Sequence, residues 1–258
     1  MIASHTEALR CWVEAQWPNV GIKLGIPHVT HAPVWQPLSG DAGFRQYFRL
    51  ACEPSVLAVY APPATEDGPA FLAVGNALRN AGVLTPRVWA SDLHEGFFLI
   101  EDLGETLLLA ELNEASADAL YGRAMAALLR IQATPVDPII FPHYDQMHLR
   151  EEMDLFPDWF CGQLLGVDLD KNTISMLNQT FELLENRALE QPQVVVHRDY
   201  HSRNLVYRSE EALGVIDFQD AVIGPITYDL VSLLRDCCLL YTSPSPRDLS
   251  TSRMPSSA

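Results

Sequence analysis

The sequence predicts an α+β fold in which a small β-rich N-terminal part precedes a larger helical part. Short apolar, β-prone segments gather at 34–38, 47–50 and 56–60, whereas the chain after residue 104 repeats apolar residues at helical spacing. From 194 to 220, short apolar runs again alternate with polar segments. This last stretch places chemically reactive side chains on loops and strand ends, where a rigid scaffold can present them.

The N-terminal part is predicted to begin with a helix over residues 1–20 that ends near Pro18, because proline lacks the N–H that an interior helical position needs. A loop then leads to the three β-prone segments. A second helix is expected over 70–81, and Gly82 is its stop signal.

The boundary between two lobes is predicted near residue 103. The apolar segment 97–100 has the character of a buried strand, and it runs into an extended linker at 101–104. Backbone groups of such a linker could bind adenine, so Glu101 and Leu103 are candidate nucleotide contacts.

A glycine-containing turn separates the first two β-prone segments, at 39–44. Gly40 and Gly43 flank Asp41, and two glycines in a turn between strands allow backbone N–H groups to approach phosphates. The same residues also suit an ordinary hairpin turn. The position of the turn, far ahead of the polar motif near residue 200, favours a loop that covers a nucleotide.

The helical part is predicted from apolar residues that recur every three or four positions. Pro157 should bend or split the second helix, and Asn172 or Thr173 should cap the third. The expected helical segments are 117–131, 149–164, 174–184 and one that begins at 228.

The most specific chemical pattern is His197-Arg198-Asp199, followed by Asn204 and then by Asp217 in an Ile-Asp-Phe sequence. Kinases use H-R-D-x-x-x-x-N and a later D-F-G-like aspartate in this order. The first Asp accepts the proton of the substrate hydroxyl, while the Asn and the second Asp hold Mg²⁺ against the phosphates, since a hard cation prefers oxygen ligands. The pattern predicts Asp199 as the catalytic base and Asn204 and Asp217 as metal ligands.

Two other interpretations of this motif are open. A chance hairpin with polar surface groups could carry a lone H-x-D, although the full pattern is much more specific than that. A zinc site through His197 and His201 would need a helix at these residues and a third ligand, and the β-prone flanks disfavour a helix.

Composition excludes several classes of partner. The net charge is −16 and the only lysines are Lys23 and Lys171, which disfavours nucleic acid and anionic membranes. The five cysteines show no C-x-x-C spacing and indicate free thiols, and no apolar run approaches a membrane span. We therefore expect a cytoplasmic protein. We also expect it to be a monomer that acts on a small molecule.

The last residues differ in composition from the rest of the chain. Eleven of residues 242–258 are Ser, Thr or Pro, as in a disordered tail. The string from Cys238 to Asp248 also resembles a translated frame of a transposon end used to build sequencing libraries. We expect an N-terminal nucleotide-binding lobe at 1–103, a truncated catalytic lobe at 104–237 and a non-native tail at 238–258.

Four blocks of the sequence resemble the aminoglycoside phosphotransferase superfamily: LSGDAGFRQYFRL, LIEDLGETLL, VVVHRDYHSRNL and GVIDFQDAVIGPITYDLVSLLRD. Within it, the sequence is most similar to the bacterial cell-wall sugar kinases that phosphorylate N-acetylmuramate and N-acetylglucosamine at the anomeric position. The similarity covers most of residues 5–237. It implies a protein-kinase-like fold with ATP between a small β-rich lobe and a larger helical lobe. It also implies Mg²⁺, Asp199 as base, an amino-sugar acceptor and a place in peptidoglycan recycling.

The sequence departs from the kinase pattern in two ways. Segment 56–60 has no lysine and segment 70–81 has no glutamate, although kinases pair these residues over the phosphates. Arg45 or Arg49 could supply the positive charge instead. Members of this family also continue with further helices after the YDLVSLLRD block, so we expect apolar surface to be exposed on the larger lobe.

The acceptor site is open to more than one interpretation. Glu152, Trp159 and Arg203 are candidate substrate contacts, and Trp159 with Phe160 could form an aromatic wall for an acetamido sugar or could pack in the core. The acidic helix at 150–158 suggests, as an alternative, an aminoglycoside or choline-type kinase. The missing strand lysine suggests a further alternative, a nucleotide-binding protein that is not an enzyme.

Overall fold

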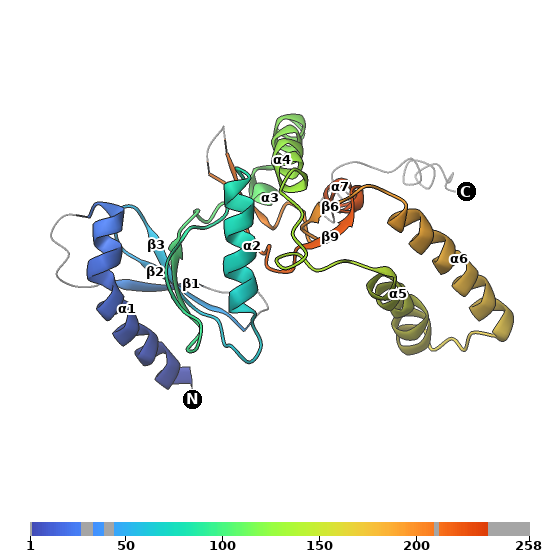
Figure 1. Cartoon of the computed structure of the whole chain (residues 1–258), viewed down its shortest axis with the longest axis horizontal. Helices are drawn as coiled ribbons and strands as arrows, with labels where there is room; N and C mark the ends of the chain where they lie inside the picture. The colour runs from blue at the N-terminus through green and yellow to red at the C-terminus, as the bar shows by residue number, and fades with distance from the viewer. Residues whose placement is uncertain (1, 27–32, 39–43, 209–211, 237–258) are drawn as a thin grey trace, which may run out of the picture. The chain divides into compact units, whose positions relative to one another are not determined.

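The structure of the chain is a computed structural model that describes residues 2–26, 33–38, 44–208 and 212–236 (Figure 1). The chain divides into two units. Unit 1 comprises residues 1–123 and 203–219, and unit 2 comprises residues 124–202 and 220–258.

Unit 1 contains a five-stranded antiparallel sheet with the strand order β1-β2-β3-β5-β4. The strands predicted in this part are confirmed. Strand β4 was not predicted, because its half-exposed residues show no alternating pattern and it is defined by its pairing with β5. The strands are β1 (Trp35–Leu38), β2 (Gln46–Leu50), β3 (Val56–Tyr60), β4 (Val88–Asp92) and β5 (Phe97–Glu101).

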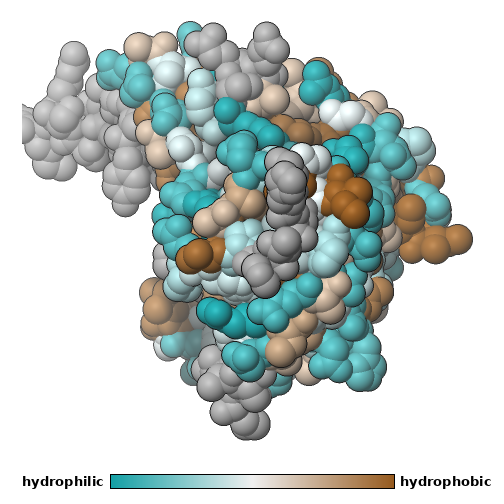
Figure 2. All heavy atoms as spheres, turned by 90° about the vertical axis from the view of Figure 1, so that its left-hand side faces the viewer, coloured by the Kyte–Doolittle hydropathy of each residue, from teal (hydrophilic) through white to brown (hydrophobic). Residues whose placement is uncertain are grey.

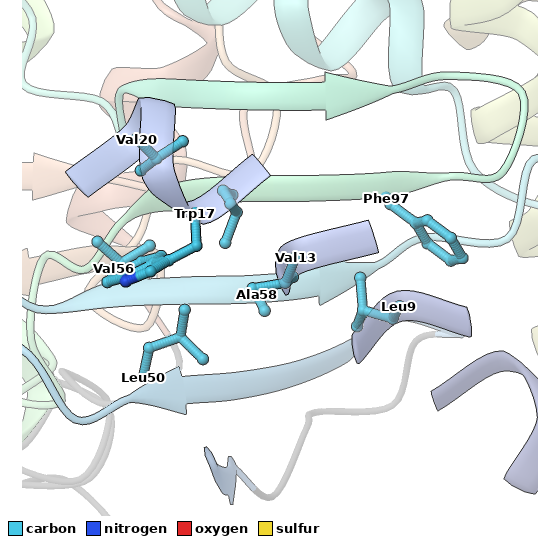
Figure 3. Packing of buried hydrophobic residues seen from close by; sticks show 9 residues of the cluster. Leu9, Val13, Trp17, Val20, Leu50, Val56, Ala58 and Phe97 are labelled. Atoms are coloured by element: carbon cyan, nitrogen blue, oxygen red, sulfur yellow. The ribbon is translucent and has the colours of Figure 1, made fainter. Parts of the chain in front are cut away.

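Helices α1 (Ile2–Leu24) and α2 (Gly68–Asn80) cover opposite faces of this sheet (Figure 1). Apolar residues at three- and four-residue spacing on α1 meet one face of the sheet, and their burial excludes water from β2, β3 and β5. Seen from the α1 side, the molecular surface is mainly hydrophilic, with hydrophobic residues in small separate patches (Figure 2). The packed residues labelled in Figure 3 are Leu9, Val13, Trp17, Val20, Leu50, Val56, Ala58 and Phe97.

The predicted end of the first helix near Pro18 is wrong, because α1 continues to Leu24. Pro18 is exposed, while Val20, one turn beyond the buried Trp17, extends the apolar stripe onto the sheet. The helix ends instead at Gly25, whose φ of 72° is a left-handed conformation that glycine adopts at no steric cost. The Gly25 N–H donates to the Ile22 carbonyl and the following N–H closes the turn, as in a Schellman motif.

Helix α2 begins two residues before the predicted start. Asp67 caps it by accepting a hydrogen bond of 2.8 Å from the Ala70 N–H, and Pro69 lies in the first turn, where no N–H is needed. The predicted stop at Gly82 is confirmed by a φ of 83°. The inner face of α2 packs on the second face of the sheet through Phe71 and Leu72.

A β-hairpin from the polar motif region also belongs to unit 1. It consists of β7 (Leu205–Tyr207) and β8 (Leu213–Val215), and a short helix α3 (Leu108–Glu111) lies beside it. A Cβ on Gly214 would lie 2.7 Å from a methyl carbon of Leu103, so the hairpin packs closely on the linker after β5. Because of these contacts, the division into units differs from the predicted lobe boundary near residue 103.

Unit 2 combines helices with a two-stranded antiparallel sheet of β6 and β9. The predicted buried face of α4 is confirmed, and α4 enters this unit at Ala124. None of the described helices is both long and apolar enough to cross a membrane. The elements are α4 (Ala117–Gln132), α5 (Gln146–Leu155), the π-helix η1 (Phe156–Leu164), α6 (Lys171–Leu189), β6 (Gln193–Val196), β9 (Val222–Pro225) and α7 (Tyr228–Leu234).

The helix around Pro157 changes type, as its proline predicts, from the α-helix α5 to the π-helix η1. The predicted caps of α6, Asn172 or Thr173, are wrong. Asp170 caps the helix instead, because its carboxylate accepts a hydrogen bond of 2.7 Å from the Thr173 N–H.

Apolar side chains on η1 and on both flanking helices are exposed, as expected for the larger lobe. Phe160 is 46% exposed and Trp159 is 65% exposed, so neither residue packs in the core of the described structure. The other large apolar side chains exposed here are Met147, Leu155, Phe156, Leu164, Leu165, Val167, Ile174, Met176, Leu183, Leu184 and Leu189.

Candidate active site

The loop that carries His197 and Asp199 follows β6 in unit 2 and is held by a buried carboxylate. Asp229, at the start of α7, accepts hydrogen bonds from the His197 N–H (2.7 Å) and from the Arg198 N–H (3.0 Å). Arg198 has a φ of 77°, which a residue with a Cβ rarely adopts. The two bonds to Asp229 hold this strained backbone in place.

Two further contacts anchor the loop just after Asp199. The Tyr200 hydroxyl donates to the carbonyl of Ala124 in α4 (2.8 Å), and the Ser202 N–H donates to the buried carboxylate of Asp236 (2.7 Å). Tyr200 is fully buried, whereas Asp199 is exposed. The anchored loop therefore presents the predicted catalytic carboxylate at the surface of unit 2.

Asp229 and Asp236 were not predicted from the sequence. The two residues lie seven positions apart in a block rich in Leu and Val, which places both carboxylates on one side of a helix or its extension. A carboxylate on the apolar side of a helix needs buried N–H donors. Two aspartates on that side could therefore have predicted that a nearby loop donates hydrogen bonds to them.

Asp229 should also make stability depend on pH. Burial raises the pKa of its carboxyl from 3.8 to about 6, although the His197 and Arg198 N–H groups act in the opposite direction. The folded state then binds a proton more tightly than the unfolded state, so this contribution is complete below about pH 4 and is lost as the pH rises through about 6. Denaturant unfolding across this range should show the free energy of unfolding falling by up to about 3 kcal/mol.

In the Asp229→Asn variant this fall should disappear. Asp168→Asn, at an exposed position in the same unit, is the matched control and should keep it. An unchanged fall in the Asp229→Asn variant would show that another group titrates.

Asn204 and Asp217 lie at adjacent ends of the β7–β8 hairpin in unit 1. The ladder pairs Leu205 with Val215, and the Ile216 N–H continues it by donating to the Asn204 carbonyl at 3.1 Å. Asp217 is exposed, and its φ of 61° turns the chain out of the strand direction. The hairpin therefore places Asn204 and Asp217 at its open end, and an amide oxygen with a carboxylate is a donor set that fits Mg²⁺.

The residue after Asp217 fixes this turn. Phe218 is buried and stacks on Phe71 of α2 with ring centroids 5.2 Å apart. A Cβ on Gly75 would lie 3.0 Å from the Phe218 ring, so the helix approaches the ring closely. The Ile-Asp-Phe sequence thus packs on α2 through its aromatic ring and leaves the carboxylate at the surface.

The structure separates the two arginines that could replace the strand lysine. Arg49 makes a bidentate ion pair with Asp102, with a distance of 2.5 Å from Nε to Oδ2, and it also pairs with Glu105. Burial opposes the charge of Asp102, but hydrogen bonds from Arg49, the Ser55 hydroxyl and the Gly104 N–H lower the pKa of its carboxyl. Arg49 therefore anchors the linker after β5.

Arg45 lies near the predicted metal ligand. Its Nε is 2.6 Å from the Glu66 carboxylate, and its Nη1 donates to the side chain of Gln219 at 3.3 Å. Glu66 precedes α2 and supplies the acidic partner that the helix itself lacks. Of the two arginines, Arg45 is the one whose contacts lead to Asp217, because Gln219 also bonds to that carboxylate.

The predicted nucleotide contacts at the linker have other partners in unit 1. The Glu101 carboxylate lies 2.7 Å from Arg208 and 3.5 Å from Arg79, and its N–H donates to the Arg87 carbonyl. Leu103 is buried. Contacts of this linker with a nucleotide stay a prediction. Gly40, Asp41 and Gly43 lie outside the described residues.

The predicted acceptor contacts belong to different units, Glu152 and Trp159 to unit 2 and Arg203 to unit 1. The Glu152 carboxylate accepts hydrogen bonds from Arg198 Nη2 (2.9 Å) and from the Tyr228 hydroxyl (3.3 Å), so it restrains the loop that carries Asp199. Trp159 is an exposed aromatic side chain on η1 of the same unit. Arg203 is exposed and begins the second segment of unit 1.

The zinc alternative is not supported. His197 and His201 lie on a loop and not on a helix. In the part of the chain that the structure describes, no three His, Cys, Asp or Glu side chains are grouped as a metal site would need. Asn204 and Asp217 offer an amide oxygen and a carboxylate, which are oxygen ligands of the kind that Mg²⁺ prefers and not the His and Cys ligands typical of zinc.

The fold is that of kinase-like phosphotransferases. A crystal structure of spectinomycin phosphotransferase in complex with ADP and spectinomycin is similar with a TM-score of 0.59 and 16% sequence identity, covering 88% of this chain and 76% of that chain. The predicted α+β class, with an antiparallel sheet in the N-terminal part and helices after it, is confirmed.

The chain belongs to the APH phosphotransferase enzyme family, whose family model matches residues 34–246. A relative from Pseudomonas aeruginosa named N-acetylmuramate/N-acetylglucosamine kinase is 41% identical over 239 residues, covering 92% of this chain and 70% of the relative. A relative of the same name from Pseudomonas putida is 42% identical over 199 residues, covering 77% of this chain. This chain spans 58% of the length of that second relative.

Proposed function

We propose that the chain is an ATP-dependent kinase that phosphorylates N-acetylmuramate or N-acetylglucosamine at the anomeric hydroxyl, as a cytoplasmic monomer in peptidoglycan recycling. The observation that carries the proposal is the surface position of Asp199 on a loop held by Asp229 and Asp236. The adjacent positions of Asn204 and Asp217 support it, as does the similarity to relatives that bear this kinase name. The solved structure with ADP supports the use of a nucleotide.

Asp199 would act on the acceptor hydroxyl. As the anomeric oxygen bonds to the γ-phosphorus, the bond from that phosphorus to the ADP oxygen breaks and the hydroxyl proton passes to the carboxylate. An anomeric hydroxyl is more acidic than other sugar hydroxyls, so the carboxylate can assist mainly by positioning. The anchored loop provides that positioning.

Asn204 and Asp217 would hold Mg²⁺ through their side-chain oxygens. When bound, Mg²⁺ neutralises charge on the phosphates as the leaving group departs. Arg45 adds a fixed positive charge in the same unit, although its pairing with Glu66 offsets part of that charge. The ion pair of Arg45 and Glu66 would thereby take the place of the lysine and glutamate that other kinases pair over the phosphates.

Trp159 is our candidate for the aromatic wall of the acceptor site. Its ring is 65% exposed, and an acetamido sugar offers an apolar methyl group and ring face that could stack on it. Glu152 is already bonded to Arg198 and Tyr228, so we assign it to the support of the loop. Arg203 stays a candidate contact for a polar group of the acceptor.

The acceptor should be identified by product analysis. The purified protein, ATP and Mg²⁺ would be incubated with N-acetylmuramate, N-acetylglucosamine, aminoglycosides and choline, with the Pseudomonas aeruginosa relative assayed in parallel. We expect phosphorus NMR to detect a sugar 1-phosphate with one or both acetamido sugars. A 6-phosphate, or turnover only with aminoglycosides or choline, would contradict the anomeric assignment and favour the alternative kinases.

A further inference from the structure

We infer that Gln219 is a positioning residue that connects Arg45 to the carboxylate of Asp217 and orients that carboxylate before a metal ion binds. The inference rests on the proposed function, because that function assigns Asp217 to Mg²⁺. It adds a role for a residue outside both the assigned metal ligands and the H-R-D-x-x-x-x-N pattern.

The two ends of the Gln219 amide make different bonds. Its oxygen accepts from Arg45 Nη1 at 3.3 Å, and its nitrogen donates to Asp217 Oδ1 at 2.8 Å. A primary amide offers both an acceptor and a donor, so it can link a guanidinium to a carboxylate without adding charge. A carboxylate in this place would have no proton to donate and would repel Asp217.

Arg45 is a fixed anchor for this connection. Its ion pair with Glu66 has an Nε–O distance of 2.6 Å, and the two side chains are only 16% and 15% exposed. The guanidinium carbon also lies 5.8 Å from the centroid of the Phe71 ring. A side chain held at its Nε and against its face has little rotamer freedom left, so it can restrain the amide bound to it.

A second connection runs beside the first. Phe71, which contacts Arg45, stacks on Phe218 with an angle of 18° between the rings, and Phe218 lies between Asp217 and Gln219 in the chain. The backbone of Asp217 has a φ of 61° and would relax if it were not restrained. The aromatic stack holds the backbone and the amide holds the side chain.

This arrangement should affect metal binding more than folding. Hydrogen bonds to a ligating carboxylate fix its direction, and their loss typically weakens metal affinity or activity by about 10- to 100-fold. Gln219 is half-buried at the hairpin end and has no part in the apolar core. We therefore expect a metal-specific effect of replacing it.

Binding of Mn²⁺ in the presence of ADP, measured by electron paramagnetic resonance, tests this directly. Replacing Gln219 by Met removes both bonds and keeps the length of the side chain. We expect Mn²⁺ affinity to fall about tenfold, the affinity for metal-free ADP to stay unchanged, and the Mg²⁺ concentration needed for half-maximal turnover to rise more than kcat falls. Gln36→Met, at an exposed position on β1, is the matched control and should change none of these.

A double-mutant cycle tests the connection itself. If Arg45 acts on Mn²⁺ binding through Gln219, the double variant Arg45→Met with Gln219→Met should bind Mn²⁺ no more weakly than the weaker single variant. Fully additive losses would overturn the connection. Should Gln219→Met unfold, Gln219→Leu removes the same two bonds and must weaken Mn²⁺ binding by a similar factor.

The outcomes separate this inference from the proposed function. Unchanged Mn²⁺ affinity in Gln219→Met, together with sugar phosphorylation by the unsubstituted protein, would overturn the inference alone. The expected loss of Mn²⁺ affinity without any sugar turnover by the unsubstituted protein would leave the inference standing and contradict the proposed acceptor. Absence of Mn²⁺ binding to the unsubstituted protein with ADP would contradict both.

Discussion

Replacing Asp199 by Asn should lower kcat for the acceptor sugar by about a thousandfold while nucleotide affinity stays unchanged. Asn has nearly the same shape but cannot accept the hydroxyl proton. The loop geometry should survive, because it depends on backbone bonds from the residues around Asp199 to Asp229 and Asp236 and not on the Asp199 carboxylate. Release of ADP in a coupled assay gives kcat, and isothermal titration gives the nucleotide affinity.

The control for this variant is Asp168→Asn, which makes the same chemical change at an exposed position of unit 2. It should retain normal turnover. A kcat within tenfold of the unsubstituted protein in Asp199→Asn would reject the assignment of Asp199 as base. A parallel loss of nucleotide binding would instead indicate that the substitution disturbs the fold.

Replacing Asp217 by Ala should reduce turnover by about a thousandfold or more, even at saturating Mg²⁺, since it removes the charged oxygen that we assign to the metal. Alanine also tolerates poorly the φ of 61° at this position. Asp217→Asn separates the two effects, because Asn accepts the left-handed conformation and removes only the charge. Both variants should be assayed over a range of Mg²⁺ concentrations, with thermal unfolding as the measure of folding.

The matched control in unit 1 is Asp118→Ala, at an exposed position in the first turn of α4. We expect it to leave the Mg²⁺ dependence unchanged. Near-normal rates of Asp217→Asn at saturating Mg²⁺ would remove Asp217 from the metal site. A normal rate of Asp217→Asn with a defect confined to Asp217→Ala would identify backbone strain as the cause.

Several features could be predicted from the sequence because they depend on neighbouring residues. The alternation of short apolar runs and polar turns located the β7–β8 hairpin, and the hairpin places Asn204 beside Asp217. The spacing of apolar residues located the buried face of α4, and Gly82 located the end of α2. In each case the residues that allowed the prediction are close in the chain to the element that they predict.

Helix α1 shows where a local signal fails. Pro18 removes one hydrogen bond from the helix, but burial of Trp17 and Val20 against the sheet stabilises the turn around it. That burial depends on strands much later in the chain. The local rule was therefore overridden by a tertiary contact.

The sequence by itself determined the class of chemistry, because the spacing of Asp199, Asn204 and Asp217 is a property of the chain. Only the tertiary structure decided which arginine contacts the residues beside Asp217. Arg49 donates a hydrogen bond to Asp102, 53 residues away in the chain, and Arg45 donates one to Gln219, 174 residues away. Arg45 and Arg49 lie four residues apart, and nothing in the sequence near them distinguishes their roles. Their partners come close to them only when the sheet, α2 and the hairpin pack together.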